Sequence, residues 1–591
     1  MQSAETVLSV LRERGRNALP CDELYRQMYN EDLYLMAYGR IYANHGAMTP
    51  GPDTETADGM SLDKIHKIIE AMRRERYRFR PVRREFIPKK NGKLRPLGLP
   101  SWSDKLVGEV VRLLLEAYYE PTFSDRSHGF RPDRGCHTAL REVEQVWTGT
   151  AWFVEGDISD CFGSLDHNIM LKILGEKIHD NRFLRLIRNM LTAGYLEDWR
   201  YHETLSGAPQ GGVASPILSN IYLNKLDIFV ETVLIPQYTR GIRRKPNPDY
   251  GRIRARIRHA RQHEDRATVR MLHRQLRQLP SRDPQDPGYR RLRYIRYADD
   301  YLLGFVGSKT EAEDIKDQLG RFLRDELALQ PNQDKTLITH ARTTAARFLG
   351  YEIITQHRPD QLTRGRRAVN GRMGLRVPWD VIKAKCAPYR SHGKPVHRPA
   401  LQNLDDFDII RTYGAEYRGI IGYYLLAHNV WQLNALEWHA KTSMLKTLAA
   451  KYQSTVTKMA AKYKATIDTP HGPRTCFQAR IHREGKKDLI ATFGGIPLKR
   501  KKDATLIDRV PGPAPTPRKE LLRRMLTRRC ELCKDAGKTV VHQVRKLASL
   551  GTPGPDQPAW AAVMATMRRK TLMVCAACHD VIHHTPVTNT A

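Results

Sequence analysis

The feature that most constrains this chain is an adjacent pair of carboxylates, Asp299 and Asp300, placed between two apolar and aromatic runs. Residues 293–296 and 301–305 are β-formers on the two sides of this pair, which predicts a hairpin with the acids at its turn. Two acids at a strand end cost free energy unless a cation or another partner neutralises them. A solvated turn is the alternative interpretation, and the local residues alone leave both open.

A second acidic element lies at 152–162, where a short apolar strand runs into Asp157. Polymerases that use two metal ions need carboxylates from different strands, which hold divalent ions roughly 3.5–4 Å apart. Asp157 together with Asp299 and Asp300 can supply such a set. Phe162 follows five residues after Asp157, where an aromatic ring can block a ribose 2′-hydroxyl; a core position is the alternative.

Length and charge indicate the class of protein. A chain of 591 residues is too long for one hydrophobic core, so several domains are expected. Lys and Arg number 98 against 64 Asp and Glu, a net charge of +34, which favours a polyanionic partner. An anionic membrane surface is the other candidate, but no apolar run approaches the roughly 20 residues that span a bilayer, and residues 1–20 do not resemble a secretory signal. We therefore expect a soluble, intracellular nucleic-acid protein without a membrane partner.

Two further segments have the composition of nucleotide-contacting loops. Asn91-Gly92 is a two-residue hairpin signal, so Lys89 and Arg95 are expected on neighbouring strands, where they can hold a triphosphate. A solvated sheet edge is the alternative for this basic hairpin. The Gly- and Pro-rich stretch 208–216 permits close backbone approach to a ligand, and Ser215-Pro216 then begins a helix.

The last 65 or so residues contain two Cys-x-x-Cys pairs and three histidines. The pairs are Cys530 with Cys533 and Cys575 with Cys578. Two such pairs in a reducing compartment indicate a tetrahedral zinc site closed by four thiolates, whereas redox or disulfide chemistry explains one pair and not both. His579 and His583 lie one helical turn apart and His542 lies on a preceding strand, so the three can surround one divalent ion that polarises a phosphate of duplex DNA.

Two basic segments are candidate nucleic-acid contacts. Residues 240–293 carry 17 basic and 5 acidic residues, and Arg266, Arg270, Arg274 and Arg277 share one helical face. A solvated face is the usual reading of a charge run, but one so unbalanced repels itself unless phosphate lies against it, which favours RNA binding. Residues 465–529 carry 16 basic and 6 acidic residues and are interrupted by Gly and Pro; DNA contact and a solubilising linker both remain open.

The order of motifs resembles the reverse transcriptases of group II introns. The motifs are IPKK-NGK-LRPLGLP from 87, SHGFRP at 127–132, DISDCF at 157–162, APQGGVASP at 208–216 and YADD at 297–300. The resemblance implies metal-dependent DNA synthesis on an RNA template. It assigns the catalytic, magnesium-binding carboxylates to Asp157, Asp299 and Asp300, the triphosphate contacts to Lys89 and Arg95, the 2′-hydroxyl gate to Phe162 and the nucleotide pocket to Gln210. Lys335 falls in the loop where polymerases often carry a proton donor to pyrophosphate.

Resemblance continues toward the end of the chain. Residues 416–424 and 445–449 resemble the thumb or maturase region that grips intron RNA by backbone and shape. The histidine and cysteine segment resembles the HNH endonuclease of the same proteins. Two positions depart from that pattern: Gln543 stands where a second histidine commonly serves as general base, and Thr571 stands where many HNH nucleases have Asn. These departures leave the identity of the base open.

The expected fold is α+β, a right-hand polymerase followed by a small zinc-stabilised ββα-metal domain. The expected domains are an N-terminal helical extension (1–75), fingers and palm (76–375, with the insertion 240–293), a thumb or maturase domain (376–465), a basic DNA-binding segment and linker (466–525) and an HNH endonuclease (526–591).

The expected function is intron mobility. The protein would bind its intron RNA, assist splicing and reverse splicing, nick double-stranded target DNA, and copy the RNA from that primer with dNTPs. Two Mg²⁺ ions, one structural Zn²⁺ and one nuclease ion are the expected cofactors, and the bacterial cytoplasm, or an organelle, is the expected location. A splicing-only maturase and a reverse transcriptase of another retroelement or defence system are the alternatives; the intron, DNA target, host and oligomeric state stay open.

Overall fold

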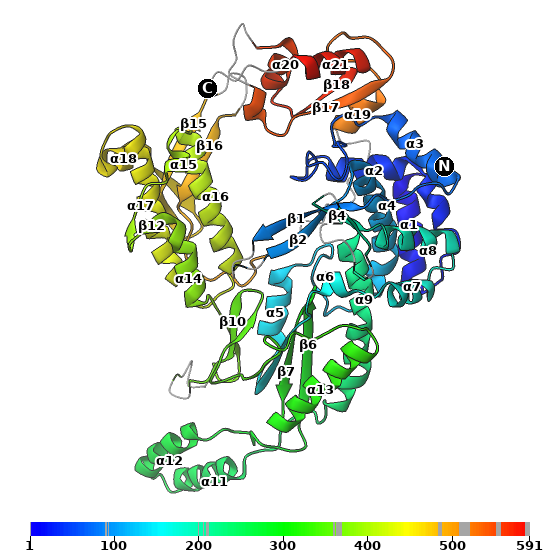
Figure 1. Cartoon of the computed structure of the whole chain (residues 1–591). Coiled ribbons are helices and arrows are strands. Elements are labelled where there is room, and N and C mark those ends of the chain that lie inside the picture. The colour runs from blue at the N-terminus through cyan, green and yellow to red at the C-terminus, as the bar shows by residue number, and fades with distance from the viewer. Residues whose placement is uncertain are drawn as a thin grey trace.

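The computed structural model describes residues 2–88, 92, 94–198, 200–204, 206–207, 212–358, 361, 369–482, 487–507, 520–550 and 557–585, without the side chains of 548 and 549. In Figure 1 the palm and its insertion lie below, the thumb lies to the left, and the C-terminal domain in red sits above the N-terminal helices in blue. Helix and strand are mixed throughout, as expected from the sequence. No helix among these residues is both long enough and apolar enough to cross a membrane.

The N-terminal helices enclose a long central helix. They are α1 (Ala4–Arg16), η1 (Tyr25–Tyr29), α2 (Glu31–Ile41) and α3 (Leu62–Arg73), packed around α4 (Trp102–Tyr119) and followed by η2 (Glu120–Thr122). Ser61 caps α3 as expected, since its side chain accepts a hydrogen bond from the Lys64 N–H. Most residues of α4 are buried, including the charged Glu109 and Arg112, which form an ion pair with each other.

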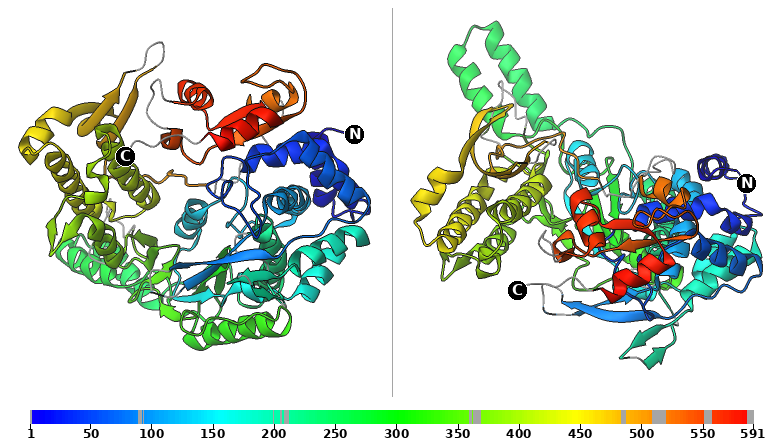
Figure 2. Two further views of the ribbon diagram at one scale, coloured as in Figure 1. Left: turned by 45° about the horizontal axis from the view of Figure 1, so that its top comes forward. Right: turned by 90° about the horizontal axis from the view of Figure 1, so that it is seen from above.

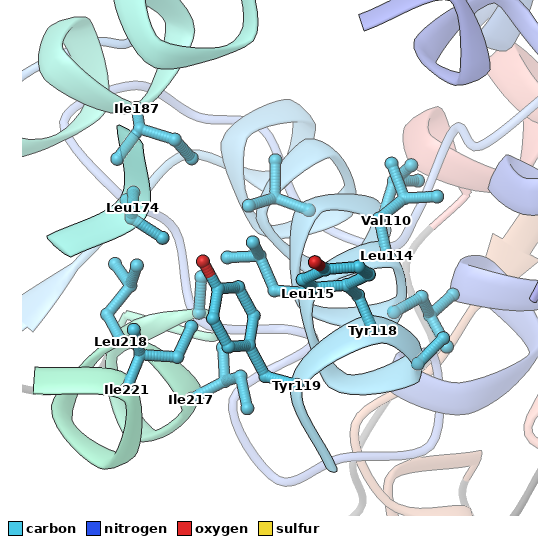
Figure 3. Packing of buried hydrophobic residues seen from close by; sticks show 14 of the residues in the cluster. Val110, Leu114, Leu115, Tyr118, Tyr119, Leu174, Ile187, Ile217, Leu218 and Ile221 are labelled. Carbon is cyan, nitrogen blue, oxygen red and sulfur yellow. The ribbon is translucent and has the colours of Figure 1, made fainter. Parts of the chain in front are cut away.

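The core around α4 joins the N-terminal helices to the palm. Figure 3 shows Tyr119 of α4 on the side of the helix that faces Leu174, Ile187 and Ile217. These partners come from α7 (His167–Gly175), α8 (Asn181–Leu191) and α9 (Ser215–Phe229). Asp166 and Ser215-Pro216 mark the starts of α7 and α9, as the sequence predicts. The polymerase body is therefore one packed unit and not a set of loosely joined parts.

The fingers contain the expected basic hairpin. Strands β1 (Val82–Pro88) and β2 (Leu94–Leu99) pair antiparallel with Ile87 opposite Arg95, and β4 (Tyr195–Glu197) and β5 (Arg200–His202) extend the sheet in the order β2-β1-β4-β5. Gly92 has a φ of +78°, a conformation that glycine adopts at little cost. Lys89 and Gln210 fall outside the described residues.

The palm is a four-stranded sheet of order β6-β7-β3-β8. Its strands are β6 (Arg291–Tyr297), β7 (Asp300–Val306), β3 (Trp152–Asp157) and β8 (Ile338–His340). Helices α5 (Cys136–Val146), α6 (Cys161–Ser164) and α13 (Lys309–Asp325) pack around it. The central strands are apolar along almost their whole length because both faces of the sheet are covered.

The basic insertion forms a projecting helical hairpin. After η3 (Val230–Leu234) and α10 (Ile235–Gln237), it consists of α11 (Pro248–Gln262) and α12 (Arg266–Gln278), which extend away from the palm in Figure 1. Buried Ile257, Ala260 and Leu272 hold the two helices together, while the arginines at 252, 254, 256, 258, 266, 270, 274 and 277 are exposed.

The thumb follows a small sheet of β9 (Ala346–Phe348), β10 (Tyr351–Thr355) and β11 (Met373–Arg376). Its helices are α14 (Trp379–Cys386), η4 (Ala387–Tyr389), α15 (Pro399–Gln402), α16 (Asp406–Tyr424), η5 (Val430–Leu433), α17 (Asn434–Lys451) and α18 (Val456–Tyr463), with the short pair β12 (Arg390–Ser391) and β13 (Lys394–Pro395). Buried Tyr413, Tyr417 and Ile421 place the apolar stripe of α16 in the core.

The structure differs from the expected boundary at 465. Strands β14 (Lys464–Thr469), β15 (Gly472–Ile481) and β16 (Leu489–Gly494) form a sheet that packs on α16. A Cβ on Gly414 would lie 2.1 Å from the Thr492 carbonyl oxygen, so strand and helix are in direct backbone contact. The first half of the basic segment is thus part of the thumb. The packing of this sheet on α16, a contact between segments far apart in the sequence, has no local sequence signal.

The C-terminal domain has the ββα arrangement with flanking helices. It contains α19 (Glu520–Leu526), β17 (Thr539–Gln543), η7 (Leu547–Leu550), α20 (Ala559–Met567), β18 (Thr571–Cys575) and α21 (Ala576–His584), with β17 and β18 antiparallel. Helix α19 packs on α2, and its Leu521, Leu522 and Met525 join the core of the N-terminal helices. Figure 2 shows the red domain lying against the blue helices.

Candidate catalytic and metal sites

The palm carboxylates lie where two strands end. Asp157, the last residue of β3, pairs with Asp300, the first residue of β7, and Asp299 occupies the turn between β6 and β7. The hairpin has Ala298 and Asp299 as its two turn residues, and Ala298 has a φ of +54°. A left-handed alanine costs free energy and persists only where surrounding contacts hold it. The structure therefore brings the three predicted acids to one end of the sheet.

A buried ion pair between β6 and α9 stabilises this turn. Arg296 on β6 and Asp227 on α9 both have fully buried side chains, and their atoms lie 2.7 Å (Nε to Oδ1) and 2.5 Å (Nη2 to Oδ2) apart. Arg296 Nη1 also donates to the Ala298 carbonyl oxygen at 2.9 Å, and the Tyr294 hydroxyl donates to Asp227 at 2.8 Å. The pair thus fixes the strained residue that precedes Asp299. Such an arrangement needs both residues to be satisfied, because a single buried charge is costly.

The SHGFRP segment packs against the same turn. The His128 N–H donates to the Arg296 carbonyl oxygen at 2.9 Å. A Cβ on Gly129 would lie only 2.5 Å from the Ala298 nitrogen, so a glycine is required for this close approach. The SHGFRP motif therefore supports the catalytic turn, a role that its sequence alone did not indicate.

The carboxylates repel one another in a buried setting. Burial, and then the neighbouring Asp299 and Asp157, raise the pKa of Asp300 to about 7. Lys335 Nζ lies 2.8 Å from Asp157 Oδ2, and Asn332 Nδ2 donates to the same oxygen at 3.0 Å. The hydrogen bond to Asp157 raises the pKa of Lys335, which therefore stays charged. An excess of buried negative charge is what a site for divalent ions requires.

Other predicted nucleotide contacts surround this end of the sheet only in part. Phe162 on α6 packs edge-on against Phe130 with their ring centroids 6.5 Å apart, and Phe130 lies equally close to Tyr297. Phe162 is half-buried and belongs to an aromatic group at the acids. Burial raises the pKa of Asp299, and Arg95, exposed on β2, only weakly opposes that rise.

Four cysteines meet at the base of the C-terminal domain. Cys530, Cys533, Cys575 and Cys578 offer sulfur atoms that all lie within 4.8 Å of one another, and Cys533 Sγ is 3.8 Å from Cys575 Sγ. Burial raises the pKa of Cys530, but backbone N–H groups around it reverse that effect and hold its pKa at about 7. Four sulfurs at these separations fit a tetrahedral zinc ion, whose Zn–S bonds are about 2.3 Å long.

Three histidines and an unexpected aspartate form a second cluster. His542 lies on β17, and His579 and His583 lie on α21; their ligand atoms and a carboxylate oxygen of Asp58 all lie within 4.8 Å of one another. His579 Nε2 is 3.3 Å from His583 Nε2. His542 is buried; its Nδ1 lies 3.2 Å from Asp58 Oδ1, and its Nε2 has no hydrogen-bond partner among the described residues. A buried ring nitrogen without a partner is costly, so this set fits the binding of a divalent ion.

Gln543 and Thr571, the two residues that depart from the HNH pattern, both make contacts outside the histidine cluster. The Gln543 side chain turns away from the histidines and donates from Nε2 to the Tyr42 carbonyl oxygen at 2.8 Å, across the domain boundary. Thr571 pairs with Gln543 across the two strands, and its carbonyl oxygen accepts from Arg524 at 3.0 Å. Both residues therefore serve packing and docking. Neither points a general base at the histidine cluster.

The carboxylate oxygens of the three palm acids do not form a cluster as compact as the cysteine and histidine sets. Within the described part of the chain, only the cysteine set and the set of Asp58 with the histidines have every ligand atom within 4.8 Å. Carboxylates that hold two ions roughly 3.5–4 Å apart, with the substrate completing the coordination, are expected to be spread more widely.

Comparison with known families gives three matches along the chain. Residues 87–239 match the reverse transcriptase (RNA-dependent DNA polymerase) family, residues 380–487 match the type II intron maturase family, and residues 530–579 match the AI2M/AI1M-like HNH endonuclease family. The first match ends where the basic insertion begins. The second includes most of the β14–β16 sheet, in agreement with its packing on the thumb.

Relatives match nearly the whole chain. The group II intron-encoded protein LtrA of Lactococcus lactis subsp. cremoris is 37% identical over 95% of this chain and 95% of its own length. The putative COX1/OXI3 intron 1 protein of Saccharomyces cerevisiae is 30% identical over 99% of this chain and 71% of its own length. A telomerase structure from Candida albicans with a telomeric RNA fragment covers 66% of this chain and 64% of its own at 10% identity, but its TM-score of 0.32 is too low to indicate a shared fold.

Proposed function

Because this chain belongs to the group II intron-encoded proteins, with reverse transcriptase, maturase and HNH endonuclease regions, we propose that it copies its intron RNA into DNA at a site that its own nuclease has nicked. Family membership makes it a reverse transcriptase that also carries an HNH nuclease. The single observation that carries the proposed chemistry is the meeting of Asp157, Asp299 and Asp300 at the end of the palm sheet.

In the polymerase site, Asp157 and Asp300 face each other across paired strands and Asp299 lies in the turn, so these three carboxylates would hold the divalent ions. Two bound Mg²⁺ ions would supply Lewis-acid chemistry, favouring loss of the primer 3′-hydroxyl proton to water and stabilising charge on the leaving pyrophosphate. As the primer oxygen forms its bond to the α-phosphorus, the bond between the α-phosphorus and pyrophosphate breaks. Lys335, positioned on Asp157, donates a proton to that leaving group. Lys89, Arg95 and Gln210 hold the incoming dNTP, and Phe162 excludes a 2′-hydroxyl.

RNA contacts fall to the thumb and to the projecting hairpin. The hairpin exposes the arginines of α11 and α12, and beside it lies a hollow of about 1140 Å³ that is lined in part by Arg244, Arg277, Arg282, Arg342 and Arg372. A concave surface with this density of charge suits the phosphates of a folded RNA. The protein would thereby grip its intron RNA and assist splicing and reverse splicing.

The C-terminal domain nicks double-stranded target DNA. His542, His579 and His583 would hold one divalent ion there, and such an ion would polarise the scissile phosphate. A zinc ion on the four cysteines would join the start of the domain to the first turn of α21, the helix that carries two of the histidines, and so fix their position. The thiol ligands and the nucleic-acid substrates suit the bacterial cytoplasm, where the cysteines stay reduced.

Paired variants test this assignment. We expect Asp299→Ala to lower divalent-dependent primer extension on an RNA template by at least about 10²-fold, with RNA binding and nicking retained. His579→Ala is the reciprocal control and should stop nicking while leaving primer extension intact. Normal extension by Asp299→Ala would refute the polymerase site, and unchanged nicking by His579→Ala would remove that residue from the nuclease site. A splicing-only maturase would show no extension in the parent protein.

A further inference from the structure

The loop between α2 and α3 contacts the C-terminal domain through an isolated β-bridge to β17. Met60 pairs antiparallel with Val541 of β17; the Val541 N–H donates to the Met60 carbonyl oxygen and the Gly59 N–H donates to the Val541 carbonyl oxygen, both at 2.8 Å. Two backbone hydrogen bonds in register fix which residue of the loop lies next to which residue of the strand. Asp58 is thereby brought to the end of β17 that carries His542.

The carboxylate of Asp58 points into the histidine cluster. Its Oδ2 lies 2.9 Å from His583 Nε2 and 3.3 Å from His579 Nε2, and its Oδ1 lies 3.2 Å from His542 Nδ1. The Gln543 N–H donates to Oδ1 at 2.7 Å and orients the group. The side chain is only 14% exposed, so the charge is held away from water among three imidazoles.

These separations are those of ligands around one ion. Bonds of about 2.0–2.2 Å place neighbouring ligand atoms about 3.0 Å apart in octahedral geometry and about 3.4 Å apart in tetrahedral geometry. The distances from Asp58 to the histidines, and between His579 and His583, fall between 2.9 and 3.3 Å. A carboxylate also supplies negative charge that three neutral imidazoles lack, which favours a divalent cation.

From this geometry we propose that Asp58 of the polymerase body is the fourth protein ligand of the nuclease ion, so that the ion binds at the boundary between the two domains. The inference rests on the proposed nuclease function and adds a ligand from a region that the nuclease family match at 530–579 does not contain. The ion then links the nuclease to the polymerase body. Asp58 is 485 residues away in sequence from Gln543 of β17, whose N–H donates to its carboxylate.

The same boundary supplies a matched control. Asp63 lies five residues further along, is also an aspartate, and also contacts the C-terminal domain through Lys538 Nζ at 3.0 Å. Its carboxylate is not part of the histidine cluster. Asp63→Asn therefore removes a charge from the same interface without touching the proposed ligand set, while Asp58→Asn keeps an oxygen to accept the Gln543 N–H.

The test uses Co²⁺ as the probe and the full chain with its cysteine site filled by Zn²⁺, in an Asp299→Ala background that removes the polymerase site as a competitor. Visible absorption reports Co²⁺ held by histidine and carboxylate ligands. We expect Asp58→Asn to weaken Co²⁺ binding at least about tenfold and Asp63→Asn to leave it unchanged. Hydrogen exchange gives a second readout: Co²⁺ should slow exchange of the Gly59 and Val541 amides in the parent, but not in Asp58→Asn.

The Co²⁺ affinities of the variants distinguish failure of the Asp58 proposal from failure of the nuclease site. Unchanged Co²⁺ affinity in Asp58→Asn, together with loss of binding in His579→Ala, would overturn the inference and leave the proposed nuclease site standing. Unchanged affinity in His579→Ala would overturn the nuclease site itself. Equal loss in Asp58→Asn and Asp63→Asn would show that general charge at the interface, and not ligation, sets the affinity. Circular dichroism and tight RNA binding confirm that each variant is folded.

Discussion

Replacing Asp227 by Asn should expose the role of the buried ion pair beneath the polymerase turn. The substitution keeps the shape of the side chain and removes the only carboxylate that contacts the Arg296 guanidinium within the described structure. Both side chains are 0% exposed, so no water can replace the lost charge. The guanidinium would remain charged, because arginine does not lose its proton in proteins.

The expected cost follows from the burial of the pair. Removing one partner of a buried salt bridge costs about 3–5 kcal/mol, because the other charge is left without compensation. A typical domain is stable by only about 5–15 kcal/mol, so a large part of the stability of the palm would be lost. In hydrogen exchange, amides of β6 and β7 should exchange faster by about two to almost four powers of ten, since each 1.4 kcal/mol is about tenfold.

Primer extension should decrease together with the stability of the palm, because Arg296 also holds the turn that carries Asp299. Arg296 holds the Ala298 carbonyl oxygen at 2.9 Å, and Ala298 has a left-handed backbone conformation that costs about 1–3 kcal/mol. An arginine that moves to find another partner releases this turn, and Asp299 moves with it. Primer extension should therefore decrease together with exchange protection.

A triple variant that removes both buried charges separates the effect on stability from the effect on primer extension. Asp227→Leu with Arg296→Met and Tyr294→Phe replaces the buried charges and the attached hydroxyl by apolar groups, which often restores stability. The bond to Ala298 remains lost, so extension should stay low although the palm is protected. The reasoning is refuted if Asp227→Asn changes exchange by less than tenfold and extends primers normally.

Three further outcomes follow from the sites. Phe162→Ala should raise incorporation of ribonucleotides relative to deoxyribonucleotides in primer extension, and an unchanged ratio would exclude Phe162 as the 2′-hydroxyl gate. Cys533→Ser should reduce bound zinc, measured by mass spectrometry, and lower the thermal stability of the C-terminal domain while primer extension persists. Burial, and then the neighbouring Asp299 and Asp157, raise the pKa of Asp300 from 3.8 to about 7, so the folded state favours its protonated form. The contribution of this one group to metal-free stability is fully present below about pH 4 and is lost as the pH rises through 7, so Mg²⁺ should stabilise the protein more at pH 8 than at pH 6.

The sequence alone determined those features that are local or that depend on order. A β-hairpin around Asp299, the helix starts at Ser61, Asp166 and Ser215, and the basic hairpin at Gly92 are encoded by neighbouring residues, and the structure contains each of them. Family membership could be recognised from the collinear motifs. Spacing of the cysteines indicated a four-sulfur cluster, because the two cysteines of a Cys-x-x-Cys pair, three positions apart in a tight turn, reach a common point.

Tertiary structure alone decided the contacts between distant segments. No pattern near Gln543 indicates that its side chain faces Tyr42, and nothing around Asp58 in its Gly- and Pro-rich loop indicates histidines as neighbours. The β14–β16 sheet likewise became part of the thumb only through packing on α16. Local propensity and periodicity specify which element a segment forms, but which surfaces meet depends on shape and burial summed over the whole chain. For that reason the carboxylate beside the nuclease histidines became visible only in the folded protein.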